Sequence, residues 1–203
     1  MTDAGTSARS GRRLPADSMN EILDAAERLL WERPLSRLTV GELMAATSLG
    51  RSSFYVHFRD LHDLAGGLLT RLEAELWEPA KLWTDADGDP QGSLAAAVRG
   101  VVAVWKRHGP VLRGIVEAAL VDDRVHGLWR TELMERFIDA ITAVIQRETS
   151  LGRIRPLPAR ETATALLLLN ERYLADRLGT LPQHDANEVA EVLTAIWTRT
   201  LYS

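Results

Sequence analysis

The hydrophobic residues of this chain recur at intervals of three and four, the spacing of one face of an α-helix. The first such stripe follows Asp17 and ends before Pro34, and similar stripes continue to the end of the chain. No segment alternates apolar and polar residues as a half-buried strand does, and no internal repeat is present. The pattern predicts an all-α fold of about nine helices. The first stripe consists of Ile22, Leu23, Ala26, Leu29 and Leu30.

Capping residues, glycines and prolines divide the stripes into separate helices. We expect the first helix to begin at about Asp17, followed by short helices at 39–46 and 51–58 and a longer one from Leu61. Gly109-Pro110 is expected to break a helix, because proline lacks the backbone N–H and clashes with the preceding turn. After a loop at 85–92, the remaining helices are expected at roughly 93–108, 110–120, 122–149, 159–178 and 186–201.

The composition excludes several classes of protein. The chain has 203 residues, 46% of them hydrophobic and 26% charged, as in a globular protein. It has no cysteine, which excludes a disulfide scaffold and a cysteine nucleophile. The longest apolar run, around 163–169, is too short to cross a membrane, and the first residues lack the apolar core of a signal sequence. We therefore expect a cytoplasmic protein without membrane association.

No motif of catalysis or cofactor binding is apparent. The sequence contains no P-loop, no G-x-G-x-x-G and no H-E-x-x-H, and it lacks the paired E-x-x-H motifs of a di-iron bundle. Two pairs, Asp122 with His126 and His57 with His62, lack further metal ligands nearby in the sequence. We expect no enzymatic activity, no cofactor and no metal site.

The segment 38–58 is the most informative for function. Two short helices joined by a four-residue turn have the arrangement of a helix-turn-helix. Thr39 and Glu42 have the spacing of a capping box, which fixes the start of the first short helix. The alternative is an ordinary α-hairpin with a solvated polar face.

The second short helix has the residue types that a DNA recognition helix needs. Small donors allow close approach to the major groove, while arginine, tyrosine and histidine reach bases or phosphates. Phe54 and Phe58 fall on the opposite, packed side. The polar residues are Arg51, Ser52, Ser53, Tyr55 and His57.

The net charge of −4 is unevenly distributed. Residues 1–60 carry eight arginines and eight acidic residues, so the negative charge belongs to residues 61–203. Within the neutral part, residues 33–59 have four arginines and one glutamate. The acidic average is therefore compatible with a DNA-binding face of modest, strongly salt-sensitive affinity.

The residues Thr39-Val-Gly-Glu-Leu-Met-Ala46 and Leu49-Gly-Arg-Ser-Ser-Phe-Tyr-Val-His-Phe58 resemble the signature of the TetR family of bacterial transcriptional regulators. The position near the N-terminus, with a larger helical part behind it, is also similar. The opening stretch lacks hydrophobic periodicity, so a flexible arm is expected over 1–16. The resemblance implies a helix-turn-helix DNA-binding domain over 17–60 and a ligand-binding and dimerisation domain over 61–203.

The resemblance also implies which side chains face DNA. Tyr55 is expected to donate to a phosphate, and Arg51 and Ser53 to reach base edges. Three positions depart from the family pattern: Ser48 replaces a glycine, Gly50 replaces a capping serine and Leu61 replaces a lysine. Glycine is an acceptable N-cap, whereas Leu61 removes one phosphate contact. The full set of expected DNA-facing residues is Arg37, Thr39, Arg51, Ser52, Ser53, Tyr55 and His57.

The C-terminal segments 163–172 and 196–202 resemble a mycobacterial member of the same family, which implies a cavity for an elongated, mostly hydrophobic effector. Asn170 lies in an apolar run and would cost about 1–3 kcal/mol if buried without a partner. Its partner is expected to be a polar group of the effector, or else a backbone carbonyl or Arg172. Leu167 replaces a second asparagine, which makes the expected cavity more apolar. The expected lining residues are Trp105, Trp129, Leu133, Phe137, Leu167, Asn170 and Trp197.

Two apolar stripes near the C-terminus are suited to dimerisation. Two helices from each chain would form a four-helix interface, and a homodimer supplies two heads for a palindromic double-stranded operator. The alternative is that these stripes pack inside one chain. The stripes are Leu166, Leu167, Leu174 and Leu178, and Val189, Val192, Leu193, Ile196, Trp197, Thr200 and Leu201.

These features together predict a ligand-responsive, DNA-binding transcriptional regulator. Because members of the family that it resembles are mostly repressors, we expect a repressor that a hydrophobic small molecule releases from its operator. The alternative is a helical carrier of lipids or small molecules. Such a carrier would share the cavity, but it would not need the segment 51–58.

Overall fold

The computed structural model describes residues 15–86 and 88–202. These residues form eight helices and no strand, if the unbroken helix from Asp123 to Ser150 is counted once. The all-α prediction is confirmed, and the expected number of about nine helices is close. The arm expected over 1–16 lies almost entirely outside the described residues.

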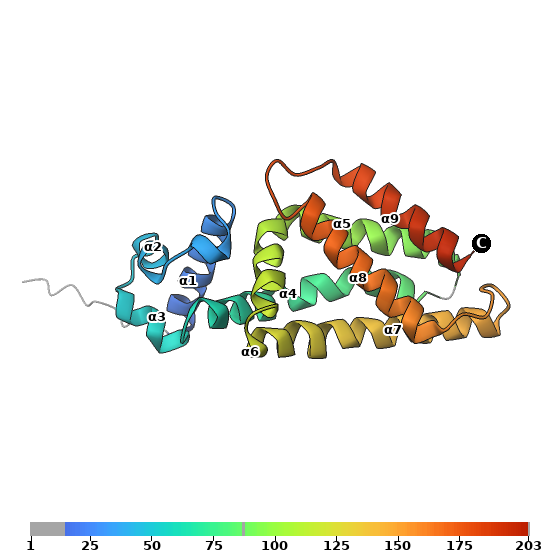
Figure 1. The fold of residues 1–203 in the computed structure, drawn as a ribbon, viewed down its shortest axis with the longest axis horizontal. Helices are drawn as coiled ribbons and strands as arrows, with labels where there is room; N and C mark the ends of the chain where they lie inside the picture. Colours follow the sequence, from blue (N-terminus) through green and yellow to red (C-terminus); the bar gives the residue numbers. More distant parts are fainter. Residues whose placement is uncertain (1–14, 87, 203) are drawn as a thin grey trace, which may run out of the picture.

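The first three helices form a small lobe at one end of the molecule, which we call the head (Figure 1). It consists of α1 (Pro15–Leu30), a 3-10 turn (Leu35–Arg37), α2 (Val40–Ala45) and α3 (Arg51–His57). Its centre holds the fully buried side chains of Ile22, Leu43 and Phe54. α1 begins at Pro15, slightly earlier than expected, because proline is well tolerated in the first turn of a helix.

The remaining helices form a larger lobe, the body, and α4 leads from the head into it (Figure 1). α4 and α5 pack against each other, and α7, α8 and α9 complete the bundle around them. Their bounds are α4 (Leu61–Thr84), α5 (Pro90–Ala119), α6 (Asp123–His126), a π-helical segment (Gly127–Met134), α7 (Glu135–Ser150), α8 (Ala159–Arg177) and α9 (Ala186–Leu201).

The break expected at Gly109-Pro110 is wrong, because α5 continues through both residues. Proline at position 110 leaves the carbonyl of Lys106 without its helical donor. Gln183, in the loop between α8 and α9, replaces that donor: its Nε2 donates to the carbonyls of Lys106 (3.2 Å) and Leu178 (2.7 Å). A distant side chain therefore satisfies the carbonyl that the proline leaves free.

The helix expected over 122–149 is continuous, but its middle differs from an α-helix. α6 passes directly into the π-helical segment Gly127–Met134, which passes directly into α7. We call residues 127–134 the π segment. π-helical turns are rare and occur often at functional sites.

The expected dimer stripes are mostly wrong as an interface, because they pack inside the protomer. On α9 the side chains of Val189, Leu193, Trp197 and Leu201 are buried, and so are Leu166 and Leu174 on α8 and Leu178 at its C-cap. Helical periodicity identifies a face that is covered, but not the element that covers it. The large apolar residues that α8 and α9 leave exposed are Leu168, Leu169 and Val192.

Among the described residues, no helix combines the length and the apolar character needed to cross a membrane.

Candidate functional site

The start of α2 is fixed by the capping box expected from the sequence. Thr39 Oγ1 accepts a hydrogen bond from the backbone N–H of Glu42 (3.2 Å), and the Glu42 carboxylate accepts from the backbone N–H of Thr39 (3.0 Å). The Thr39 hydroxyl also donates to Glu42 (2.7 Å), and Arg33 forms an ion pair with it (2.8 Å). These hydrogen bonds, with that from the Thr39 hydroxyl foremost, hold the pKa of Glu42 below its ordinary value. The turn into the helix pair is therefore well ordered locally.

α3 has one packed and one exposed face, as its sequence indicates. Phe54 and Phe58 are buried in the head, whereas Arg51 and Ser52 are exposed and Tyr55 is 54% exposed. Ser53 and His57 are half-buried between these faces, and Arg37 and Thr39 are exposed before α2. The exposed side of α3 therefore offers hydroxyl and guanidinium donors to a partner.

Two features of α3 were not predicted. His57 Nε2 lies 2.8 Å from Ser18 Oγ of α1, so one ring nitrogen is used to join two helices of the head. Val56 is 75% exposed and lies one helical turn beyond Ser52, on the outward face. An apolar side chain in this place is suited to contact a thymine methyl group. The sequence signal for Val56 is its place between Tyr55 and His57 on a helix whose packed side is marked by Phe54 and Phe58.

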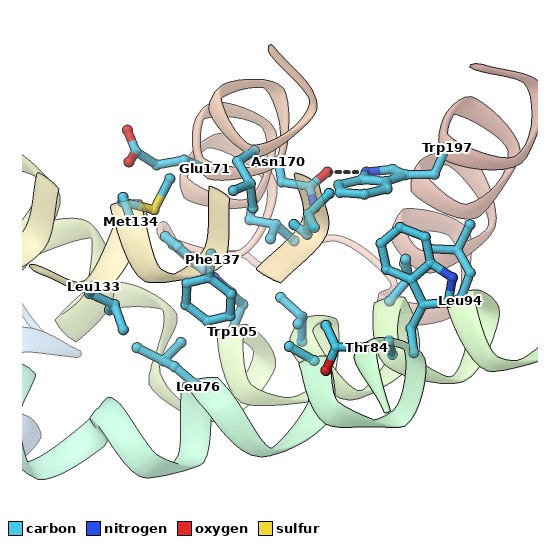
Figure 2. A pocket seen from close by; sticks show the side chains of 18 of the residues that line it. Leu76, Thr84, Leu94, Trp105, Leu133, Met134, Phe137, Asn170, Glu171 and Trp197 are labelled. Atoms are coloured by element: carbon cyan, nitrogen blue, oxygen red, sulfur yellow. Dashed lines mark hydrogen bonds between the residues drawn. The ribbon is translucent and has the colours of Figure 1, made fainter. Parts of the chain in front are cut away.

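An apolar cavity of about 100 Å³ lies in the body (Figure 2). It is surrounded by α4, α5, α8, α9 and the continuous helix that the π segment forms with α7. Most of its wall is aliphatic and aromatic. Its volume is below the roughly 300–1,000 Å³ of typical ligand pockets, so side chains must move to admit a larger molecule. The wall includes all seven residues expected there: Trp105, Trp129, Leu133, Phe137, Leu167, Asn170 and Trp197.

Asn170 has a partner that the sequence did not suggest. Its Oδ1 accepts a hydrogen bond from the indole N–H of Trp197 at 2.9 Å (Figure 2), so the expectation of a backbone carbonyl or Arg172 is wrong. An indole nitrogen only donates, which fixes the amide oxygen toward Trp197. The amide nitrogen makes no hydrogen bond to any residue within 15–86 and 88–202. Trp83 packs edge-on against Trp197, with ring centroids 5.8 Å apart.

Glu171 also lies in the cavity wall and was missed by the sequence reasoning. Its Oε2 accepts from the indole N–H of Trp129 (2.7 Å) and pairs with Arg130 (3.3 Å). Trp105 is buried, but in the described part of the chain its N–H has no acceptor. Two N–H donors of the wall, those of Trp105 and Asn170, therefore make no hydrogen bond to the described residues. A hydrogen-bond acceptor is the complementary group.

Comparison with known proteins agrees with this arrangement. Residues 22–65 match the model of the bacterial regulatory proteins of the tetR family, and residues 94–203 match that of the C-terminal domain of the transcriptional regulator EthR. The chain is 32% identical to the HTH-type transcriptional regulator EthR of Mycobacterium tuberculosis over 100% of its own length and 98% of that protein. It is 26% identical to EthR of Mycolicibacterium smegmatis, over 96% and 90% of the two chains.

A solved structure has a similar fold. NalD, described as the secondary repressor of the MexAB-OprM multidrug efflux pump in Pseudomonas aeruginosa, superposes with a TM-score of 0.72. The two share 20% identity over 93% of this chain and 98% of NalD. With its helix-turn-helix head, its helical body and these relatives, the chain belongs to the TetR family of transcriptional regulators and has an EthR-like C-terminal domain.

Proposed function

We propose that this protein is a homodimeric, cytoplasmic repressor that binds a palindromic operator and is released by a hydrophobic small molecule. One observation carries the proposal: α4 begins beside the DNA-facing helix and then forms part of the cavity wall with Leu76 and Trp83. A single helix therefore joins the two activities. The mechanism needs no catalysis, cofactor or metal.

The head, over 17–60, would read the operator with the face of α3. Arg51 and Ser52 are exposed there, and a half-buried Ser53 lies at its border. Arg37, Thr39 and Tyr55 would position the head on phosphates, which give affinity rather than specificity. The Nδ1 of His57 has no partner among the residues described and could donate to a phosphate while Nε2 holds Ser18.

The body, over 61–203, would dimerise through the outer faces of α8 and α9. Leu168, Leu169 and Val192 form exposed apolar positions on these two helices. A two-fold axis beside them would place two helices of each protomer in contact and present two heads to two half-sites.

Tyr55→Phe is expected to weaken binding to all duplexes by a similar factor, about threefold to tenfold. The change removes one hydroxyl donor from a phosphate contact, worth about 0.5–1.5 kcal/mol, without altering base contacts. The measurement is a gel shift with the best and a mid-ranked duplex that the wild-type protein selects from a random library. An unchanged affinity would mean that Tyr55 does not bind phosphate.

The effector is expected to be mostly apolar with one hydrogen-bond acceptor, such as a carbonyl or ether oxygen. The free donors in the cavity wall, on Trp105 and Asn170, favour this group. Glu171 is ion-paired with Arg130 and accepts a hydrogen bond from Trp129, so the described residues of the wall offer no unpaired charge to a charged molecule. A molecule larger than the present cavity would displace side chains of the helices that line it.

Asn170→Ala is expected to lower the free energy of unfolding by about 1–3 kcal/mol, because it leaves the buried N–H of Trp197 without an acceptor. Urea denaturation followed by circular dichroism measures this change. Carbonyl compounds that raise the melting temperature of the wild type should lose at least half of that rise in the variant. If neither stability nor the response to these compounds changed, Asn170 would have no role in the cavity.

A further inference from the structure

Charged side chains from two helices meet where the head joins the body, and we call them the Arg124 cluster: Asp60, Asp63, Asp122 and Arg124. Arg124 Nη2 donates to Asp60 (2.8 Å) and Asp122 (2.6 Å), and its Nε donates to Asp122 (3.0 Å). Asp63 lies 3.9 Å away from the guanidinium. One arginine therefore bridges carboxylates that belong to different parts of the chain.

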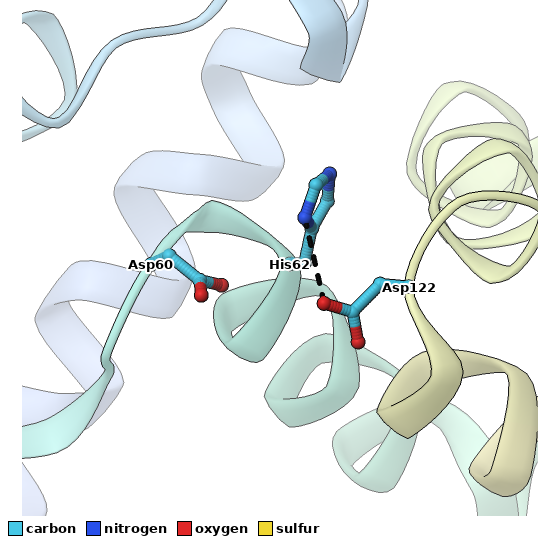
Figure 3. A group of neighbouring side chains, drawn as sticks. All are labelled: Asp60, His62 and Asp122. Carbon is cyan, nitrogen blue, oxygen red and sulfur yellow. Dashed lines mark ion pairs between the residues drawn. The ribbon is translucent and has the colours of Figure 1, made fainter.

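The composition of this junction superficially suggests a metal site. Asp60, His62 and Asp122 lie close together, with His62 Nδ1 3.6 Å from Asp122 (Figure 3). The Arg124 guanidinium already contacts both carboxylates, however, so the protein itself partly compensates their negative charge and occupies their oxygens. Hydrogen bonding from Arg124 is the main reason why the pKa of Asp122 lies well below its ordinary value. The cluster is a set of ion pairs that connects the start of α4 with the start of α6.

The two bridged carboxylates cap the two helices that connect the head with the cavity. Asp60 is the N-cap of α4, and α3 ends at His57, three residues before it. Asp122 is the N-cap of α6, which continues without interruption into the π segment. Arg124 thus ties the beginning of one helix to the beginning of the other, immediately behind the DNA-facing helix.

The same two helices form opposing parts of the cavity wall farther along. α4 contributes Leu76 and Trp83, and the π segment contributes Trp129 and Leu133. Trp129 is only five residues beyond Arg124 on the same helix. Leu128 packs closely on Gly66 of α4, where an added Cβ would lie 3.1 Å from it. A short, packed path therefore connects the cavity wall with Arg124.

We propose that Arg124 is a positioning residue that couples the cavity to the DNA-reading head. This inference rests on the proposed function. When the cavity is filled, the π segment and α4 are pushed apart, and the Arg124 bridge converts this displacement into a rotation of the N-terminal end of α4. The head follows, because only Phe58 and Arg59 separate α3 from Asp60. Without the bridge, filling the cavity no longer changes the head position.

A cycle of two substitutions tests this role without knowledge of the natural effector. Ala97→Phe fills the cavity from α5, where Ala97 is buried in the wall, and Arg124→Ala removes the bridge. The readout is the affinity for the duplex that the wild-type protein selects from a random library, by fluorescence anisotropy. Ala97→Leu is the smaller replacement if the phenylalanine prevents folding.

We expect Ala97→Phe to lower DNA affinity about tenfold in the wild-type background, within the usual range of allosteric coupling. In the Arg124→Ala background the same change should lower it less than about twofold. Arg160→Ala is the matched control, because Arg160 also bridges two carboxylates, Asp139 and Glu135, but joins two body helices. In that background the full tenfold effect should persist.

An equal effect of Ala97→Phe with and without Arg124 would overturn the proposal, since a merely structural arginine would lower affinity by a constant factor. No effect of the filled cavity in any background would also overturn it. If the wild-type protein selected no duplex at all, the proposed function would fail first, and the two failures would therefore be distinguishable.

Discussion

Gly109→Ala is expected to lower the free energy of unfolding by about 3 kcal/mol. An added Cβ would lie 1.9 Å from the carbonyl oxygen and 2.7 Å from the carbonyl carbon of Leu178. These are backbone atoms at the end of α8, so relief requires the shift of a whole helix end, and such overpacking costs about 1–3 kcal/mol or more. The measurement is the midpoint of urea denaturation, followed by circular dichroism.

Gly127→Ala is the matched control for this prediction. Gly127 is also helical, but an added Cβ would meet no atom within 4 Å. Alanine should be neutral there or stabilise by up to about 1 kcal/mol, in line with its helix propensity. If Gly109→Ala left the midpoint unchanged, the close crossing of α5 and α8 would be wrong. That crossing also positions Trp105, which lies one helical turn before Gly109 and forms part of the cavity wall.

Arg51→Glu is expected to reduce the affinity for the selected duplex by at least about 100-fold. The change removes an arginine from the exposed face of α3, where one base contact is worth about 1–3 kcal/mol. It also places a carboxylate against the phosphates, which adds electrostatic repulsion. Fluorescence anisotropy at fixed salt measures the loss.

Arg155→Glu controls for the change in net charge. Arg155 is exposed in the loop between α7 and α8, in the body. Reversing the charge of Arg155 changes the net charge of the protein by the same amount as Arg51→Glu. It should reduce DNA affinity no more than about threefold, because only the long-range electrostatic field of the protein changes. Equal losses in the two variants would mean that α3 does not contact the duplex.

The sequence predicted the local features of the head well. The capping box of Thr39 and Glu42 involves residues three apart, and the buried face of α3 follows from the spacing of Phe54 and Phe58. Both depend on short-range geometry, which residue types and periodicity encode directly. The wall of the cavity was also anticipated, chiefly through resemblance to a family.

The features that were wrong or missed depend on residues far apart in the chain. Pro110 does not end α5, and the carbonyl that the proline leaves free accepts a hydrogen bond from the distant Gln183. The partner of Asn170 is Trp197, 27 positions away. Periodicity cannot identify such partners. It also failed to distinguish a stripe that packs inside the protomer, as on α9, from one that dimerises.

The most direct test of the central claim is a selection from random double-stranded DNA by the wild-type protein, followed by affinity measurements at increasing salt. We expect enrichment of a palindrome with two half-sites and an affinity that falls steeply as salt rises, since phosphate contacts release counterions. A helical carrier of small molecules would enrich no sequence. Absence of enrichment, with no salt-dependent binding, would contradict the assignment of this protein as an operator-binding repressor.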